Sequence, residues 1–137
     1  MLQTSSLALD AAQPPRVELP PETLRDDDER LRRARRWRCA RCGHGITDDA
    51  SRTEVDGRHV HLRLNPSAFA FLFGCFGEAR GCLLVGEPTA EATWFSGCRW
   101  QFAHCAACGA HLGWAFSGAQ AFFALVLERL VAPEAEG

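Results

Sequence analysis

Two matched cysteine pairs have a spacing that predicts metal chemistry. Cys39 and Cys42 form one Cys-x-x-Cys-Gly sequence, and Cys105 and Cys108 form a second. A turn of this kind directs two thiolates toward one point, and four thiolates are a preferred tetrahedral ligand set of structural zinc. The glycine after each pair permits the tight turn. We therefore predict one structural Zn²⁺ ion bound by Cys39, Cys42, Cys105 and Cys108.

Other roles for these cysteines are less well supported. One pair could be a redox motif, or all four could be free core thiols, but two matched pairs favour a metal site. His44 or His111 could replace a cysteine ligand, although four sulfurs already complete the shell. A complete shell leaves no position for a reactive water, so we expect no metal catalysis. The remaining cysteines, Cys75, Cys82 and Cys98, are interpreted as buried free thiols.

Three tryptophans lie close together in the sequence and suggest a second site. Trp94 and Trp100 flank a Ser-Gly turn, while Trp114 and Phe116 alternate onto one face of a predicted strand. Tryptophan is more often a core residue than part of a ligand cage. Here the second cysteine pair lies between these residues and would fix their geometry. We therefore predict an aromatic cage.

The cage could hold a cation or a neutral ring. Cation cages use cation–π attraction and commonly add a carboxylate. The nearest carboxylates, Glu87 and Glu91, lie outside the segment from Trp94 to Phe116. An imide presents an acceptor, a donor and an acceptor along one edge, which a strand backbone can match. Aromatic faces that exclude water would strengthen these few hydrogen bonds. A neutral ring is favoured.

Length and composition indicate one soluble domain. The chain has 137 residues, 47% hydrophobic, and a formal net charge of −2, which is enough to build a hydrophobic core. The near-neutral charge gives no reason to expect nucleic acid or an anionic membrane as a partner. We find neither a signal peptide nor an apolar run long enough to span a membrane. A cytoplasmic monomer is expected.

The chain divides into a leader and a β-rich domain. Residues 1–35 are predicted to be disordered or partly helical, with a short helix over 23–36, and residues 36–132 are predicted to form the domain. A turn is predicted at Gly86-Glu87-Pro88. The apolar run 122–131 is interpreted as one buried strand, with a short helix as the alternative. The other predicted strands cover 58–62, 69–76, 81–85, 93–95, 99–103 and 112–116.

Most of the sequence after the first 35 residues resembles the cereblon thalidomide-binding (CULT) domain family. The likeness is carried by TWFSGCRW from Thr93 to Trp100, by Cys105-x-x-Cys108 and by HLGWAF from His111 to Phe116. It extends from about Trp37 to Val131, and it is most similar to stand-alone bacterial members. The resemblance implies a mainly β fold, the β-tent, in which two antiparallel sheets meet at an angle and are pinned by structural zinc. It also implies a signalling or binding role toward cyclic imides such as glutarimide, thalidomide-like or uracil-like rings, or cyclic-imide protein termini.

The resemblance also assigns residues to the cage. It implies that Trp94, Trp100 and Trp114 form the walls and Phe116 the floor. It implies further that the Ala92 carbonyl accepts from the imide N–H, that the Trp94 amide donates to an imide oxygen, and that Asn65 approaches the ligand.

The sequence also departs from the family pattern. Ala92 replaces a histidine of eukaryotic members, which predicts weaker binding. Ser96 and Cys98 stand where proline and an aromatic residue are common, which predicts a looser turn. The ubiquitin-ligase adaptor surface of eukaryotic cereblon is not carried over, because the chain has no room for it.

Two alternatives use the same fold. A methionine sulfoxide reductase of the B type would need a reactive cysteine beside an arginine, for which Cys98-Arg99 is the candidate. The surrounding sequence does not resemble that enzyme's active-site motif, so we expect a binding module and not an enzyme. An RNA-end sensor would need a basic groove, but acidic residues outnumber arginines after Cys42.

Overall fold

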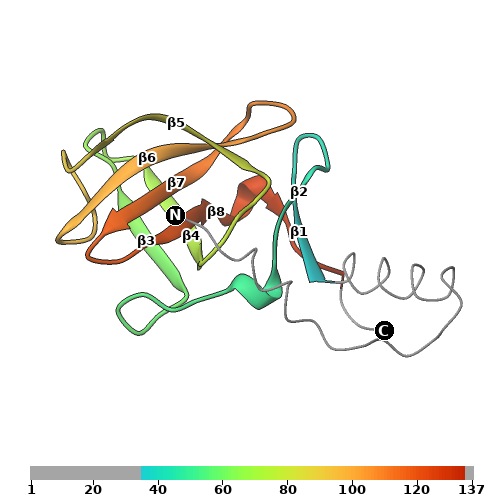
Figure 1. Cartoon of the computed structure of the whole chain (residues 1–137), viewed down its shortest axis with the longest axis horizontal. Helices are drawn as coiled ribbons and strands as arrows, with labels where there is room; N and C mark the ends of the chain where they lie inside the picture. The colour runs from blue at the N-terminus through green and yellow to red at the C-terminus, as the bar shows by residue number, and fades with distance from the viewer. Residues whose placement is uncertain (1–34, 135–137) are drawn as a thin grey trace, which may run out of the picture.

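The computed structural model describes residues 35–134, which form two antiparallel β-sheets (Figure 1). The small sheet has the order β2-β1-β9, and the large sheet has the order β3-β4-β8-β7-β6-β5. The strands of the small sheet are β1 (Arg36–Cys39), β2 (Gly45–Asp48) and β9 (Leu130–Val131). The strands of the large sheet are β3 (Val60–Leu64), β4 (Ala70–Phe76), β5 (Cys82–Thr89), β6 (Cys98–Cys105), β7 (His111–Gly118) and β8 (Phe122–Val126). The predicted mainly β fold of two antiparallel sheets is confirmed.

Alternating apolar side chains place β7 in the centre of the large sheet. Leu112, Trp114 and Phe116 expose 1%, 8% and 3% of their surface, so one face of this strand is covered by the core from Leu112 to Phe116. Trp114 and Phe116 belong to a core cluster that also contains Phe73 of β4, whereas Leu112 belongs to a second cluster with Cys39 and Cys105. One strand therefore contributes to both ends of the core.

The apolar run 122–131 is divided between the two sheets. β8 pairs with β4 and β7 in the large sheet, a short 3₁₀ turn η3 (Leu127–Arg129) follows, and β9 pairs with β1 in the small sheet. The predicted single strand over 122–131 is therefore wrong. Its apolar density reflects burial in two adjacent layers, which hydrophobicity alone does not distinguish from one long buried strand.

A glycine contact closes the junction between the sheets. The Gly81 N–H donates to the Ile46 carbonyl at 3.0 Å, and the Gly81 carbonyl accepts from the Ala106 N–H at 2.9 Å. A Cβ atom at Gly81 would lie 2.6 Å from the Ile46 Cα. This position requires glycine because two backbones approach closely there.

The predicted strand over 93–95 is wrong, because these residues form a turn and bend before β6. The Thr93 hydroxyl lies 3.3 Å from the Phe95 carbonyl and 3.4 Å from the Phe95 nitrogen. Such local side-chain bonds compete with a strand ladder. Ala92, just before them, has a φ of 56°, which lies in the left-handed region and turns the chain away from an extended path.

The predicted turn at Gly86-Glu87-Pro88 lies inside β5. The register between β5 and β6 shifts between Val85 and Thr89, and Gly86 has a φ of 88°. These features describe a β-bulge, and the strand resumes beyond it. Pro88 is tolerated because β5 is an edge strand.

The N-terminal predictions fall mostly outside the described residues. Of the predicted leader and its helix over 23–36, only Arg35 and Arg36 belong to the described residues. Arg36 is the first residue of β1 and not the last residue of a helix. No helix in the described part of the chain is long and apolar enough to span a membrane.

Candidate metal centre and ligand cavity

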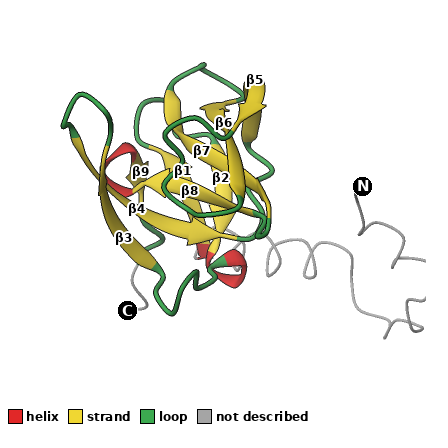
Figure 2. Ribbon diagram, turned by 90° about the vertical axis from the view of Figure 1, so that its left-hand side faces the viewer, coloured by secondary structure: helices red, strands yellow, loops and turns green. Residues whose placement is uncertain are grey.

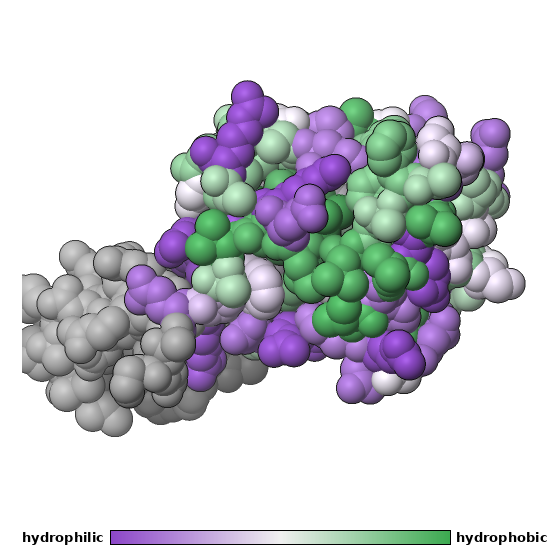
Figure 3. Space-filling view, turned by 180° about the vertical axis from the view of Figure 1, so that it is seen from behind, coloured by the Kyte–Doolittle hydropathy of each residue, from purple (hydrophilic) through white to green (hydrophobic). Residues whose placement is uncertain are grey.

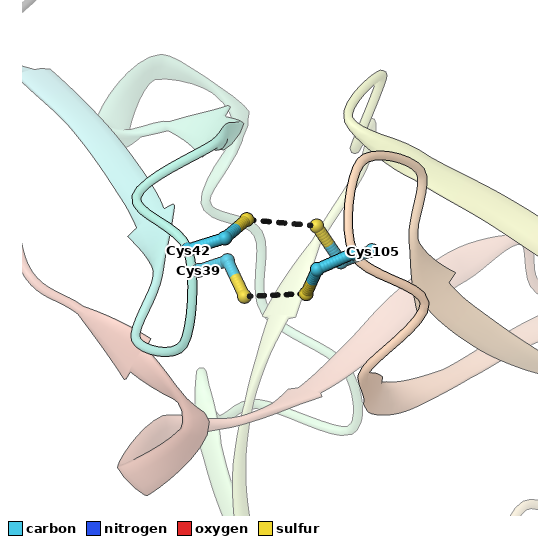
Figure 4. Close-up of side chains that lie close together, drawn as sticks. Cys39, Cys42 and Cys105 are labelled. Atoms are coloured by element: carbon cyan, nitrogen blue, oxygen red, sulfur yellow. Dashed lines mark hydrogen bonds between the residues drawn. The ribbon is translucent and has the colours of Figure 1, made fainter.

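The four predicted cysteine ligands come together where β1 and β2 face the β6–β7 connection (Figure 4). Their sulfur atoms all lie within 4.8 Å of one another. The Sγ atoms of Cys39 and Cys108 are 3.7 Å apart, and those of Cys42 and Cys105 are 3.6 Å apart. Four sulfurs at 2.3 Å from a tetrahedral zinc ion would be separated by about 3.8 Å. The cluster therefore fits a metal ion of this size.

The two cysteine turns have the same hydrogen-bond pattern. The Cys39 N–H donates to the His44 carbonyl and the Cys39 carbonyl accepts from the Gly43 N–H, both at 2.8 Å. Cys105 makes the equivalent bonds with Ala110 and Gly109, also at 2.8 Å. Gly43 and Gly109 have φ angles of 83° and 82°. The repeated sequence thus folds into a repeated local structure, which presents its two thiols in the same way from each sheet.

The electrostatic environment prepares one thiol for metal binding. Burial acts to raise the pKa of Cys105, but the amides of Cys108 and Ala107 and the neighbouring thiols outweigh it and lower that pKa to about 7. The amide of His44 has the largest single effect on the pKa of Cys42 and lowers it, but desolvation and the three adjacent thiols together raise that pKa to about 12. Metal ions bind thiolates, so the lowered pKa of Cys105 is in the direction that favours metal binding.

The predicted cage residues line one cavity of about 560 Å³, which we call the aromatic cavity. It lies between the tip of the β3–β4 hairpin, the loop before β6, and the central strands β6 and β7. Figure 2 shows this hairpin at the edge of the large sheet. The six predicted ligand-binding residues all contribute to its lining: Asn65, Ala92, Trp94, Trp100, Trp114 and Phe116.

The aromatic rings of the cavity are packed at fixed angles. The rings of Trp94 and Trp114 are 4.9 Å apart and nearly perpendicular at 81°. Phe73 stacks on Trp94 at 5.5 Å, and Phe116 stacks on Phe122 at 5.1 Å. Such packing limits side-chain rotation, so the cavity walls are largely formed before any ligand binds.

The indole N–H groups of two walls are already hydrogen-bonded. Trp94 Nε1 donates to the Leu64 carbonyl, and Trp100 Nε1 donates to the Glu91 carbonyl, both at 2.8 Å. These walls therefore offer aromatic faces to a ligand. Within residues 35–134, the Ala92 carbonyl and the Trp94 backbone N–H have no backbone hydrogen-bond partner.

Asn65 has a structural role in the hairpin tip. Its Oδ1 atom accepts from the backbone N–H groups of Ser67 and Phe69, each at 2.9 Å. This arrangement is an Asx turn that shapes the loop between β3 and β4. The Nδ2 group has no hydrogen-bond partner among the described residues.

Sequence reasoning missed several residues of the aromatic cavity. Its lining also includes Pro66, Phe71, Glu91, Phe102 and His111. Phe71 and Phe102 fall in predicted strands, but nothing in the sequence indicates which face they take. Glu91 was placed outside the cage because it precedes Trp94. In the structure Glu91 is an exposed residue that lines the cavity, one position before Ala92.

The three remaining cysteines lie outside both sites. Cys75 and Cys98 are buried, with 0% and 1% exposure, and Cys82 is partly buried. Cys98 Sγ lies 3.7 Å from the Gln120 carbonyl. Cys98 does not line the aromatic cavity, so the residue considered for a reductase is not placed to meet a ligand there.

Apolar surface continues beside the cavity on the β3–β4 hairpin. Leu62, Leu64 and Phe69 expose 61%, 59% and 65% of their surface. The space-filling view shows apolar side chains gathered over part of one face (Figure 3). Single exposed apolar residues are common, but a group of them on one hairpin is a distinct feature of this surface.

The fold and the two candidate sites define a small β-sheet domain with a four-cysteine cluster and an aromatic cavity. No protein-family model matches the chain. Cereblon from Xenopus tropicalis is 46% identical over 54 residues, which are 39% of this chain and 12% of that protein. Cereblon from Gallus gallus is 39% identical over 61 residues, and that from Danio rerio is 33% identical over 54. Each match covers 39% of this chain, and they cover 14% and 12% of the two relatives.

Over this matched region the chain is similar in sequence to cereblon, which supports a cereblon-like (CULT) domain. The matched region spans only about one eighth of the length of these relatives, so the activities of the whole proteins are not transferred to it. The relatives are from a frog, a bird and a fish. A closer likeness to stand-alone bacterial members therefore stays a prediction.

Proposed function

We propose that this domain is a binding module for a small cyclic imide. The ligand would lie in the aromatic cavity between Trp94, Trp100 and Trp114, above Phe116. One observation carries the proposal: all six residues predicted for the site line a single cavity of about 560 Å³. Glutarimide and uracil-like rings, or a cyclic imide at a protein terminus, are the ligand classes considered.

The polar groups of the cavity support an imide. The Ala92 carbonyl would accept from the imide N–H, and the Trp94 amide would donate to one imide oxygen. Two indole N–H groups are engaged with the protein, so the ring of the ligand would meet aromatic faces while its edge meets the backbone. A dry site of this kind makes an unpaired polar group costly, which is the basis of specificity.

We propose that the metal is one Zn²⁺ ion held by Cys39, Cys42, Cys105 and Cys108. Zinc bound there would tie the small sheet to the β6–β7 connection and offset the charge of the thiolates. The second cysteine pair also helps to position the aromatic cavity, because β6 and β7, the strands on either side of it, carry Trp100, Trp114 and Phe116. The monomeric state, the cytoplasmic location and the absence of nucleic-acid, membrane, enzymatic and ligase-adaptor roles remain predictions.

The test is a comparison of three ligands by calorimetry and by tryptophan fluorescence. Glutarimide is expected to bind and to quench fluorescence. N-methylglutarimide should not bind, because it lacks the donor for Ala92, at a cost of about 1–3 kcal/mol. Trp100→Ala should abolish binding while the zinc content stays unchanged.

A cation cage is the competing function, and the presence of Glu91 among the residues that line the cavity is the observation that favours it. A trimethylammonium compound is therefore the third ligand. Binding of trimethylammonium without binding of glutarimide would overturn the imide proposal.

A further inference from the structure

Arg129 links the first cysteine turn to the back of the aromatic cavity. It is the last residue of η3, where the chain passes from the large sheet to the small one. Its carbonyl accepts from the Ala40 N–H at 3.0 Å, and Ala40 directly follows Cys39. The Arg129 backbone is therefore fixed at the junction of the two sheets.

The Arg129 side chain contacts two residues that line the cavity. Its Nη1 atom donates to the His111 carbonyl at 3.0 Å and lies 3.4 Å from His111 Nδ1. Its guanidinium carbon lies 5.6 Å from the centre of the Phe71 ring. His111 belongs to β7 and Phe71 to β4. One guanidinium group therefore contacts lining residues from two different strands.

These contacts define the protonation state of His111. Its Nε2 atom lies 3.0 Å from the Gly113 carbonyl and must carry a proton to donate to it. Its Nδ1 atom faces the Arg129 donor and must therefore be the acceptor. The ring in this neutral form stands edge-to-face against Trp114 at 5.1 Å and Phe102 at 5.3 Å.

We propose that Arg129 is a positioning residue of the ligand site, which keeps His111 neutral and fixed against the Trp114 wall. This role rests on the proposed function of the aromatic cavity. Protonation of His111 would place a second donor opposite the guanidinium group and a positive charge in the wall. The wall would then lose its alignment, and a ligand packed on Trp114 would bind more weakly.

The charges around His111 agree with this role. Burial is the main cause that lowers the pKa of His111, and Arg129 and His104 lower it further, while the Gly113 carbonyl acts in the opposite direction. The His104 ring of β6 lies 5.4 Å from the His111 ring. Among the residues that line the aromatic cavity, Glu91 is the acidic one, and it is exposed.

The experiment compares Arg129→Met with the unchanged full chain and with Arg80→Met. Arg80 is 77% exposed and serves as the matched loss of one positive charge. The two readouts are the His111 pKa, from an NMR titration, and the glutarimide affinity as a function of pH. In Arg129→Met we expect a higher His111 pKa and an affinity about three- to tenfold weaker, the range for one ordinary hydrogen bond. The acid-side loss of affinity should also begin at a higher pH.

A second variant covers the case in which Arg129→Met does not fold. Arg129→Gln keeps a donor but removes the charge, so it should raise the His111 pKa and retain part of the affinity. If the variants that fold keep the His111 pKa and the affinity of the unchanged chain, the role of Arg129 is overturned. If the unchanged chain fails to bind glutarimide, the proposed function is overturned instead.

Discussion

The indole N–H of Trp94 donates a hydrogen bond of 2.8 Å to the carbonyl oxygen of Leu64, 30 positions earlier in the chain. Leu64 is the last residue of β3, and Trp94 lies in the loop before β6. The bond therefore connects the tip of the β3–β4 hairpin to the opposite side of the aromatic cavity. Trp94 therefore both lines the cavity and stabilises the position of the hairpin tip.

Replacing Trp94 by phenylalanine tests this connection. Trp94→Phe keeps an aromatic face but leaves the Leu64 carbonyl without its donor, so we expect a loss of about 1 kcal/mol in glutarimide binding. Amide hydrogen exchange near Asn65 should become faster, because the hairpin tip is less constrained. Calorimetry and exchange measurements provide the two values.

Trp37→Phe is the matched control for this change. Trp37 also donates its indole N–H, to Asp49 Oδ1 at 2.8 Å, but it packs on Phe76 away from the cavity. Its loss should leave ligand affinity unchanged. Equal effects of the two substitutions on affinity would contradict a specific role for the Trp94 bond.

Metal content should be one zinc ion per chain, and folding should depend on it. Cys105→Ser removes one of the four clustered sulfurs, so we expect loss of both the metal and the folded state, since site formation and folding are coupled. Elemental analysis and circular dichroism would measure these. Cys82→Ser is the control, because Cys82 pairs with Cys105 across β5 and β6 but lies outside the cluster. Recovery of fully folded, metal-free protein would contradict the prediction.

Alkaline pH should destabilise the fold through Cys75. Its side chain is fully buried, and burial raises its pKa from 9.0 to about 12. The positive charge of Arg63 lowers this pKa, and the negative charge of Asp56 raises it. The native state then keeps a proton that the unfolded state releases. The stabilisation by this thiol is present below pH 9 and is lost as the pH rises from 9 toward 12.

The effect can be isolated with Cys75→Ala. Across this pH range, the free energy of unfolding of the unchanged chain should fall more steeply than that of the variant, by about 1.4 kcal/mol per pH unit. Urea unfolding at several pH values would give both slopes. Equal slopes for the unchanged chain and the variant would show that Cys75 has the same pKa in the folded and unfolded states.

Gly81 should be intolerant of even one added methyl group. In Gly81→Ala the Cβ atom would meet the Gly45–Ile46 backbone, where the closest gap to a carbon atom is 2.6 Å. Backbone cannot move aside as a flexible side chain can, so we expect a loss of about 1–3 kcal/mol of stability. Gly77→Ala is the control, since its Cβ would lie 3.8 Å from the Ser51 carbonyl. Gly81→Ala should therefore have a lower melting temperature than Gly77→Ala, and equal melting temperatures would contradict a close backbone approach at Gly81.

The four cysteines and the tryptophan grouping could be proposed from the sequence because their chemistry is local, whereas Asn65 and Ala92 were assigned only through the family resemblance. Each Cys-x-x-Cys-Gly sequence encodes its own turn, and the structure shows the same bonds and φ angles in both copies. The alternation of Trp114 and Phe116 encodes a shared strand face in the same way. Short-range patterns of this kind carry their geometry with them.

Tertiary structure decided what lies between distant segments. His111, Phe71 and Glu91 meet at one cavity because β7, β4 and the loop before β6 converge there, and no local pattern encodes that convergence. The apolar run 122–131 divides between two sheets because its burial comes from two different layers. Arg129 contacts His111 because it lies in η3, the turn at which the chain passes from the large sheet to the small one. Side-chain type and spacing were sufficient for the individual turns and faces, whereas packing between strands determined which faces form one site.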